Sequence, residues 1–514
     1  MQKKQVSCRI PSYGLFVFRR VVLWGACLVL VTAAAGCAIN PVSGRTEMAV
    51  ISVEKERELG DQAAVKVEAG MGLVADPVPL AYVQAVGGRV AKLSPRQDLS
   101  YTFQIVNQPA PNAFALPNGN IYISRGLLAL ANSEDELAGV LGHEVVHVAA
   151  RHTVRSANMA VATSPLRIAA GLAGAAAGMI APRVGEGIAG LGDVATAAIL
   201  APYGRSQERE ADDLGVDLVA RAGYDPKGLL SILQTMERDE ELRKNGPPHE
   251  SFFDTHPTTP ERVRETREKA AALRVEPAAP IARTRGDFLS RLNGLLLGDD
   301  PADGAFLESR FYQPTLGITL RFPTGWQTRN TPVAVVGHTK DKEALLLVAA
   351  AAKGDDPLQV AREAEKEGDI RLLEQAKVLE INGLRAVRSA VSVESSRGPA
   401  TLDVTWIAHG GIVYQILGLC PTPRLAAYRR LFDDTVSSFR AMTAADAAQL
   451  RETRLRIVAA RAGERPADIA RRTGSVWSAN EIAVANALTA DGRLAAGQLV
   501  KVAVSEPYQA RRSE

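Results

Sequence analysis

The stretch SEDELAGVLGHEVVHVAARH, residues 133–152, determines the expected fold of the first half of the chain. It opens with Ser133 and has Glu136 three residues later, a capping box that starts a helix at Ser133. Apolar residues then recur at intervals of three and four, which predicts one buried face. These residues are Leu137, Val140, Leu141, Val145 and Val148. At about 100° per residue, His143 and His147 lie at the edge of that face and border the core.

Two histidines four residues apart on a helix lie on one side, one turn apart, and suit two imidazoles that bind one ion. His143 and His147 have that spacing. Glu144 follows the first histidine, where its carboxylate can reach a water on the metal. The bare HExxH pattern also arises by chance, so the prediction depends on a third protein ligand that leaves one coordination position open.

The run SQEREADDLG supplies the candidate third ligand, Glu208. Asp212 lies one turn later on the same face, where it would hold the outer nitrogen of a ligand histidine. Ala211 and Gly215 share that face, so another helix can approach closely. Glu210 is an alternative ligand, and a solvated charged face is the alternative interpretation of the whole run.

A hairpin is expected just before the histidine-bearing helix. Asn118-Gly119 is a turn signal between two strand-like runs, Ala113–Leu116 and Asn120–Ser124. The helix containing Glu208 is expected over about 204–222, with Gly223 as its C-terminal stop.

Residues 1–36 are typical of an export signal, because basic residues precede an apolar run from Val21 to Ala35 and Gly36-Cys37 follows. The run is shorter than the ~20 residues of a membrane helix, which favours a cleaved signal over an uncleaved anchor. AAGC resembles the bacterial lipobox, in which Cys37 is lipidated, although Ala34 replaces the usual leucine. Ala38 after the cysteine favours the outer membrane. An ordinary signal peptide is the alternative.

Cleavage would remove five basic residues and no acidic ones, taking the formal charge from +3 to −2. A nearly neutral protein lacks the strongly basic face of a nucleic-acid-binding protein, so we expect no nucleic-acid partner. Cys8 and Cys27 would leave with the signal and Cys37 would carry lipid. Only Cys420 remains, which excludes an intramolecular disulfide.

The composition predicts a multidomain α+β protein of 514 residues. Residues 37–283 are expected to form a mainly helical zincin-type domain with a small edge sheet, and residues 284–315 a linker rich in Pro, Gly and Asp. Residues 316–445 alternate strands with helices at about 357–366 and 423–439, an α+β module with a weak resemblance to PsbP. Within the first domain, the Ala- and Gly-rich stretch 159–201 is expected to pack as helices near the membrane, with a transmembrane hairpin as the alternative.

Residues 446–514 are expected to form a βααβ module. Over 454–504 it resembles the LysM glycan-binding repeat, although Gly463-Glu464-Arg465 replaces the usual GDT. The resemblance implies docking on peptidoglycan, and a packing module without glycan binding is the alternative.

Three motifs in order resemble one zinc peptidase family, that of HtpX, BepA and the CAAX prenyl proteases. They are HEVVHVAARH, the ExxAD of Glu208–Asp212, and THPTTPER from Thr255, preceded by a matching NAFALPNG segment. The resemblance covers about residues 38–270 and implies one zinc ion per chain held by His143, His147 and Glu208, with Glu144 as general base and acid. The chain resembles the periplasmic lipoprotein branch.

The resemblance also assigns candidate roles around the zinc. His256 matches a histidine that can cap the zinc as a fourth ligand and hold the enzyme latent; oxyanion stabilisation and loop packing are its alternatives. Arg262 would stabilise a developing oxyanion or form a surface salt bridge. His152 is expected to be structural or to support a ligand. Substrate would add as an extended strand along the edge formed by Ala113, Phe114, Ala115 and Leu116.

The sequence therefore predicts a zinc metalloendopeptidase on the periplasmic face of the outer membrane that cleaves misfolded or misassembled envelope proteins. Two other functions stay open. One is a peptidoglycan-docked chaperone or scaffold with little proteolysis, and the other is a cell-wall hydrolase targeted by the tail.

Overall fold

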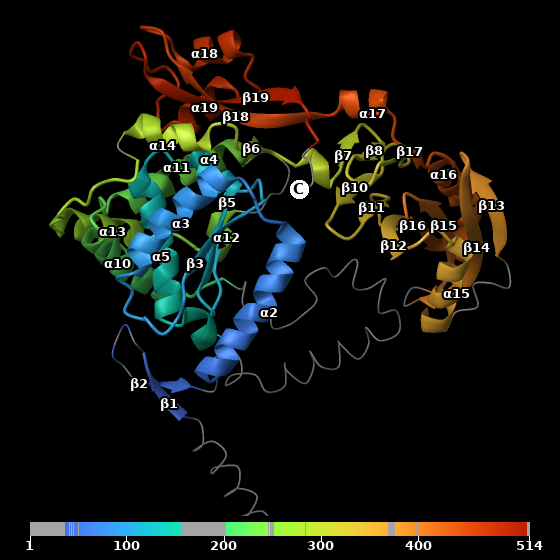
Figure 1. Cartoon of the computed structure of the whole chain (residues 1–514), viewed down its shortest axis with the longest axis horizontal. Coiled ribbons are helices and arrows are strands. Elements are labelled where there is room, and N and C mark those ends of the chain that lie inside the picture. The colour runs from blue at the N-terminus through green and yellow to red at the C-terminus, as the bar shows by residue number, and fades with distance from the viewer. Residues whose placement is uncertain are drawn as a thin grey trace, which may run out of the picture.

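The computed structural model describes residues 36–40, 42, 44, 46–49, 51–156, 202–244, 246, 251–282, 284–368, 376–395 and 398–510. Figure 1 shows three parts: a helical part from β1 to α14, a sheet-rich part from β7 to β17, and a C-terminal part that lies across the first. The first 35 residues and the Ala- and Gly-rich stretch up to residue 201 lie outside the described residues, so the signal and the membrane-proximal helices stay predictions.

The helical part packs around α5, Glu134–Ala149, which begins at the predicted N-cap because Ser133 Oγ accepts a hydrogen bond from the Glu136 amide. Every residue of α5 except Asp135 is buried. The helices around it are α2 (Val53–Met71), α3 (Pro77–Ala91), α4 (Arg125–Leu130), α10 (Arg205–Arg221), α11 (Gly228–Arg243), α12 (Phe252–Thr255), α13 (Pro260–Ala272) and α14 (Arg285–Leu292). None of the described helices is both long and apolar enough to cross a membrane.

A three-stranded sheet lies beside α5 in the order β3-β5-β4. β3 (Thr102–Val106) is parallel to β5 (Asn120–Ser124), and β4 (Ala113–Ala115) pairs antiparallel with β5 at the edge. The predicted hairpin is confirmed, with a shorter first strand. Phe114 and Tyr122 face α2, whereas Ala113 and Ala115 face the main core, as strand alternation requires.

The described chain begins with an N-terminal hairpin, and the sheet-rich part follows the helical part. β1 (Gly36–Ile39), which contains Cys37, pairs with β2 (Thr46–Ala49). The sheet-rich part holds a seven-stranded antiparallel sheet, β10-β11-β12-β16-β15-β14-β13, and a four-stranded sheet, β17-β9-β8-β7. Its helices α15 (Pro357–Gly368) and α16 (Leu425–Ser437) match the two predicted ones. The strands are β7 (Ala305–Leu307), β8 (Arg310–Gln313), β9 (Ile318–Arg321), β10 (Gln327–Asn330), β11 (Val335–His338), β12 (Leu345–Lys353), β13 (Lys377–Ile381), β14 (Leu384–Ser395), β15 (Gly398–His409), β16 (Ile412–Pro421) and β17 (Arg440–Ala441).

The segment 284–315 differs from the predicted linker. It carries α14, β6 (Leu296–Leu297), the 3-10 helix Pro301–Asp303, β7 and β8. Thr284 caps α14, and Phe288, Leu289 and Leu292 are buried in the main core, so an apolar stripe outweighs the Pro, Gly and Asp residues that predicted a linker.

The C-terminal part follows the predicted order of strand, helix, helix, strand. After the short helix α17 (Ala444–Gln449) come β18 (Arg451–Ala459), α18 (Pro466–Thr473), α19 (Ala479–Ala485) and β19 (Leu499–Pro507). β18 pairs with both β19 and β6, which makes one sheet from segments about 150 residues apart. Leu455, Ala485 and Ala503 join the core of the helical part.

Lys501 anchors this contact. Its ammonium is fully buried and donates hydrogen bonds to the carbonyl oxygens of Ala129, Leu130 and Ala131 at 2.8, 3.0 and 2.7 Å. These are carbonyls at the C-terminal end of α4, where a helix has no internal partner and favours a cation. Glu136 on α5 lies close enough to act electrostatically on Lys501. Burial lowers the pKa of Lys501, but the three carbonyl acceptors need all three hydrogens of the ammonium form, so a buried cation docks the C-terminal part on the helical part.

We expect Lys501→Met to lower the free energy of unfolding by about 3 kcal/mol, because three buried carbonyls lose their donor and Glu136 loses a nearby positive charge. Urea denaturation followed by tryptophan fluorescence measures the change. Lys353→Met, at an exposed position on β12, serves as the control and should leave the midpoint unchanged. A wild-type midpoint for Lys501→Met would contradict the anchoring role.

Candidate metal centre

Close packing of two helices forms the centre. α5 presents His143, Glu144 and His147, each at most 1% exposed. α10 crosses α5 at Gly215, where a Cβ atom would lie 3.3 Å from the His143 amide nitrogen and Cα. Only glycine allows this approach without a shift of the neighbour, and it brings Glu208 and Asp212 of α10 to the two histidines.

The donor atoms of four residues converge. Nε2 of His147 lies 2.9 Å from Nε2 of His143 and 3.4 Å from Oε1 of Glu208. Nε2 of His143 lies 3.7 Å from Oε2 of Glu208, and Nδ1 of His256 lies 3.1 Å from Oε1 of Glu208. All four residues are buried, and one ligand atom from each lies within 4.8 Å of the others.

This donor set fits a divalent metal ion. Ligand atoms about 2.05 Å from a tetrahedral ion are roughly 3.3 Å apart, close to the separations above. Two buried imidazole nitrogens that face each other beside a carboxylate are suited to bind a cation together. Burial raises the pKa of a carboxyl, but hydrogen bonds from His147 and His256 outweigh it and hold the pKa of Glu208 far below its usual range. Burial lowers the pKa of His147, which favours the neutral, metal-binding form.

Glu144 lies beside the cluster without hydrogen-bond partners. Both of its carboxylate oxygens are buried and unpaired among the described residues. The nearest cationic group is His256, whose Nε2 lies 3.6 Å from Oε1. Burial raises the pKa of Glu144 above its usual value. A raised pKa and two free acceptor oxygens suit a group that takes up and releases a proton.

Asp212 and Arg262 form a buried support behind the ligands. Oδ1 of Asp212 lies 3.0 Å from Nδ1 of His143. The Arg262 guanidinium forms a two-point ion pair with Asp212 and lies 2.5 Å from Oε2 of Glu208, and it also donates to the Pro257 carbonyl. Arg262 is 3% exposed, so it does not form a surface salt bridge. Its donors are directed to these partners, which favours a supporting role over an oxyanion contact.

His256 joins the cluster from the loop after α12. Its ring stacks on Phe252 at 4.4 Å between centroids, and its Nε2 lies 3.3 Å from the Ala113 carbonyl oxygen. Burial lowers the pKa of His256, but the carboxylates of Glu144 and Glu208 outweigh it and the pKa is raised. His256 therefore contacts the donor atoms and the edge strand β4 together.

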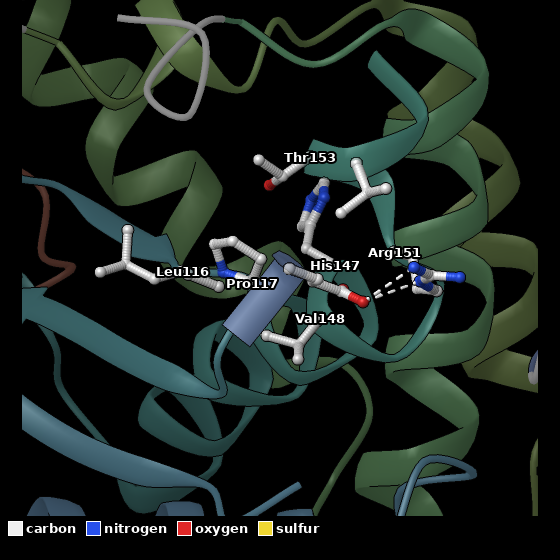
Figure 2. A pocket seen from close by; sticks show the side chains of 9 residues that line it. Leu116, Pro117, His147, Val148, Arg151 and Thr153 are labelled. Carbon is white, nitrogen blue, oxygen red and sulfur yellow. Dashed lines mark hydrogen bonds and ion pairs between the residues drawn. The ribbon is translucent and has the colours of Figure 1, made fainter. Parts of the chain in front are cut away.

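A small hollow lies beside His147 at the end of β4 and has no room for a water molecule in this structure. In Figure 2, Leu116 and Pro117 lie on the side of the hollow opposite Arg151, with His147 between them. Arg151 is held there by Glu56 of α2, whose carboxylate is also paired with Arg96. The hollow joins the predicted substrate edge to the cluster.

The sequence did not predict two ring contacts of the cluster, and one of its candidate ligands, Glu210, lies outside the cluster. Tyr203 stacks on His147 at 3.9 Å between centroids, and Phe252 stacks on His256. Neither has a spacing signal in the sequence, although both stand within five residues of a motif. Glu210, the alternative ligand, points away from the cluster and pairs with His152.

Comparison with known proteins shows that this region is similar to a peptidase family. Residues 77–270 match the profile described as "Peptidase family M48", so this region is similar to that family. The Beta-barrel assembly-enhancing protease of Yersinia pestis is 29% identical over 240 residues, covering 46% of this chain and 49% of that protein. Metalloprotease LoiP of Escherichia coli is 32% identical over 161 residues, covering 31% of this chain and 59% of that protein.

The alignment thus spans about half the length of the Yersinia pestis protein. One further relative and one solved structure also match part of the chain. The mitochondrial metalloendopeptidase OMA1 of Schizosaccharomyces pombe is 29% identical over 231 residues, covering 44% of this chain and 65% of that protein. The solution structure of cyanobacterial PsbP from Synechocystis is 16% identical with a TM-score of 0.23, covering 27% of this chain and 95% of that chain. The resemblances to PsbP, to LysM and to the integral-membrane family members stay predictions.

We expect the purified protein to contain one divalent ion per chain, measured by elemental analysis after removal of loosely bound metal. Glu208→Ala should lower this content well below one, because it removes the only carboxylate of the four-residue cluster. His409→Ala, on the far strand β15, is the control and should keep full occupancy. Full occupancy in Glu208→Ala would show that the ion binds elsewhere.

Proposed function

We propose that the protein is a zinc-dependent metalloendopeptidase with His143, His147 and Glu208 as ligands. The observation that supports this most directly is the convergence of these donors beside a buried carboxylate, Glu144, that has no partner among the described residues. The similarity of residues 77–270 to peptidase family M48 agrees with it. Zinc is favoured among divalent metals because two imidazoles and one carboxylate with one further position are typical of its catalytic sites.

Zinc supplies a Lewis acid that activates water and polarises a peptide carbonyl when it is bound. Glu144 accepts the proton of the attacking water and returns it to the leaving amine, which its raised pKa favours. Asp212 orients His143 through Nδ1, and Arg262 balances the charge of Asp212 and Glu208. These residues hold the site in one geometry during the reaction.

The substrate would bind along the edge of β4 that does not pair with β5, which is buried in this structure. The amide of Leu116 and the carbonyl of Asn112 pair with β5, so the backbone groups of Ala113 and Ala115 point the other way, since successive residues of an antiparallel strand alternate. An extended peptide can pair there with little dependence on its sequence. Unfolded proteins expose such extended segments, which suits them as clients.

His256 would act as a latch in this arrangement. Nδ1 stands at the ligand cluster and Nε2 at the Ala113 carbonyl, so one ring covers both the fourth metal position and a backbone acceptor that a substrate needs. The loop must move away before substrate binds. The rival roles, oxyanion stabilisation and loop packing, predict different results in the test below.

The envelope setting rests on the signal-like N-terminus and on the relatives. We infer that Cys37 is lipidated and holds the enzyme at the periplasmic face of the outer membrane. One relative is named a Beta-barrel assembly-enhancing protease, which supports misfolded or misassembled envelope proteins as clients. Residues 454–504 would add peptidoglycan as a partner.

Glu144→Gln should reduce cleavage of an unfolded protein such as casein by about 10²–10⁴-fold, because the amide cannot accept the proton. The variant should keep its metal, which separates lost catalysis from lost structure. Asp213→Asn, an exposed change on α10, should cleave as the wild type does. Undiminished cleavage by a metal-replete Glu144→Gln preparation would rule out the proposed enzyme and favour a chaperone or scaffold.

His256→Ala should raise the initial rate of casein cleavage several-fold, because the fourth metal position and the β4 edge become accessible. Metal content, measured in parallel, should stay at one ion per chain since three ligands remain. A lost activity with retained metal would instead assign His256 a catalytic role. An unchanged rate would leave it a packing residue.

A further inference from the structure

A row of four polar side chains runs outward from the candidate metal centre on the side of His147. Nδ1 of His152 lies 2.9 Å from Nδ1 of His147, and Nε2 of His152 lies 3.1 Å from Oε2 of Glu210. Arg155 donates to the same carboxylate oxygen at 2.8 Å. His152 is fully buried, whereas the Glu210 side chain is 21% exposed. The row therefore connects a ligand histidine to the rim of the protein.

The end of helix α5 and the turn that follows it bring His152 to this position. Five residues further along a continuous helix, His152 would point roughly 140° away from His147. α5 instead ends at Ala149, and Arg151 takes a left-handed conformation with φ of 55°. The chain turns, and Gln207 of α10 donates to the His152 carbonyl at 2.9 Å. His152 then lies beside His147.

The hydrogen positions along the row follow from chemistry. A metal on Nε2 of His147 needs the lone pair there, so the ring hydrogen is on Nδ1. That hydrogen is donated to Nδ1 of His152, which must then carry its own hydrogen on Nε2. The Glu210 carboxylate accepts this second hydrogen. Each ring nitrogen of the row is thus either a donor or an acceptor. The hydrogen bonds together make Nε2 of His147 a stronger electron donor to the metal.

The other ligand histidine has a shorter support of the same kind. His143 faces the Asp212 carboxylate directly, and Asp212 is paired with Arg262. Both rows of hydrogen bonds thus end in an arginine. On the His147 side, the neutral imidazole of His152 lies between the ligand histidine and the carboxylate. A leucine or valine in place of His152 would fill the space yet leave the His147 hydrogen without an acceptor.

We propose that His152 and Glu210 are positioning residues for the metal, which fix the tautomer and ring orientation of His147 and strengthen its bond to the ion. The inference rests on the proposed metal site. Hydrogen-bond partners of ligand histidines typically contribute about 10–100-fold in metal affinity. Loss of the acceptor at position 152 should therefore weaken zinc binding by about that factor.

Zinc affinity of the full chain, measured by competition with a chromophoric chelator, tests the proposal without depending on activity. His152→Leu should weaken zinc binding about 10–100-fold. His152→Asn places an amide oxygen near the former Nδ1 and should recover most of the affinity, which a merely space-filling role would not explain. Glu210→Gln keeps an acceptor but removes the charge, and should weaken binding by less than His152→Leu.

Controls distinguish the possible failures. Asp213→Asn removes a neighbouring carboxylate on α10 that faces Lys269 and should bind zinc as the wild type does. The thermal midpoint of each metal-free variant shows whether it folds; if His152→Leu does not fold, Glu210→Gln decides. Wild-type affinity in both Glu210→Gln and a folded His152→Leu, or in Glu210→Gln alone if His152→Leu does not fold, would overturn the proposal. A wild-type chain that binds no zinc would overturn the proposed function instead.

Discussion

The contact between Gly215 and the backbone of His143 is the constraint on which the centre depends. A methyl group at this position would meet the His143 amide nitrogen and Cα at 3.3 Å and would press the two helices apart. α10 supplies Glu208, Glu210 and Asp212, so even a small displacement would act on all three carboxylates together. Gly142 of α5 meets Val219 from the other side, which makes the crossing close in both directions.

Charge balance limits the site as much as its shape does. Glu144, Glu208 and Asp212 are at most 3% exposed, and Arg262 is the one arginine in direct contact with two of them among the described residues. Unpaired charges in such a place are strongly unfavourable. A divalent ion between the donors would offset this negative charge, and His256, which stands between Glu144 and Glu208, would add to the compensation when it is protonated. The burial that makes Glu144 a useful proton acceptor is the same burial that requires the other charges to be paired.

The sequence predicts the elements that carry strong local signals. Ser133 as helix cap, the strands on either side of Asn118-Gly119, the helix over 204–222 and the βααβ order of the tail all have turn or capping residues at fixed positions, and the structure has them. Two features escaped prediction. The segment 284–315 has linker-like composition, yet Phe288, Leu289 and Leu292 pack into a core formed by residues far away in sequence. The stacking of Tyr203 on His147 joins chain segments more than 50 residues apart, and no periodicity encodes it.

The pairing of β6 with β18 has a consequence for how the chain is assembled. Leu297 and Thr453 are register partners, so the chain leaves the helical part and returns to it at almost the same point. The sheet-rich part is thus inserted between β6 and β18, which are paired strands of one sheet. A guest domain with neighbouring entry and exit points can be exchanged or lost without breaking its host. The helical part is accordingly discontinuous in sequence, because Leu455, Ala485 and Ala503 of the C-terminal part belong to its core. The inserted part can therefore vary in structure with little effect on that core.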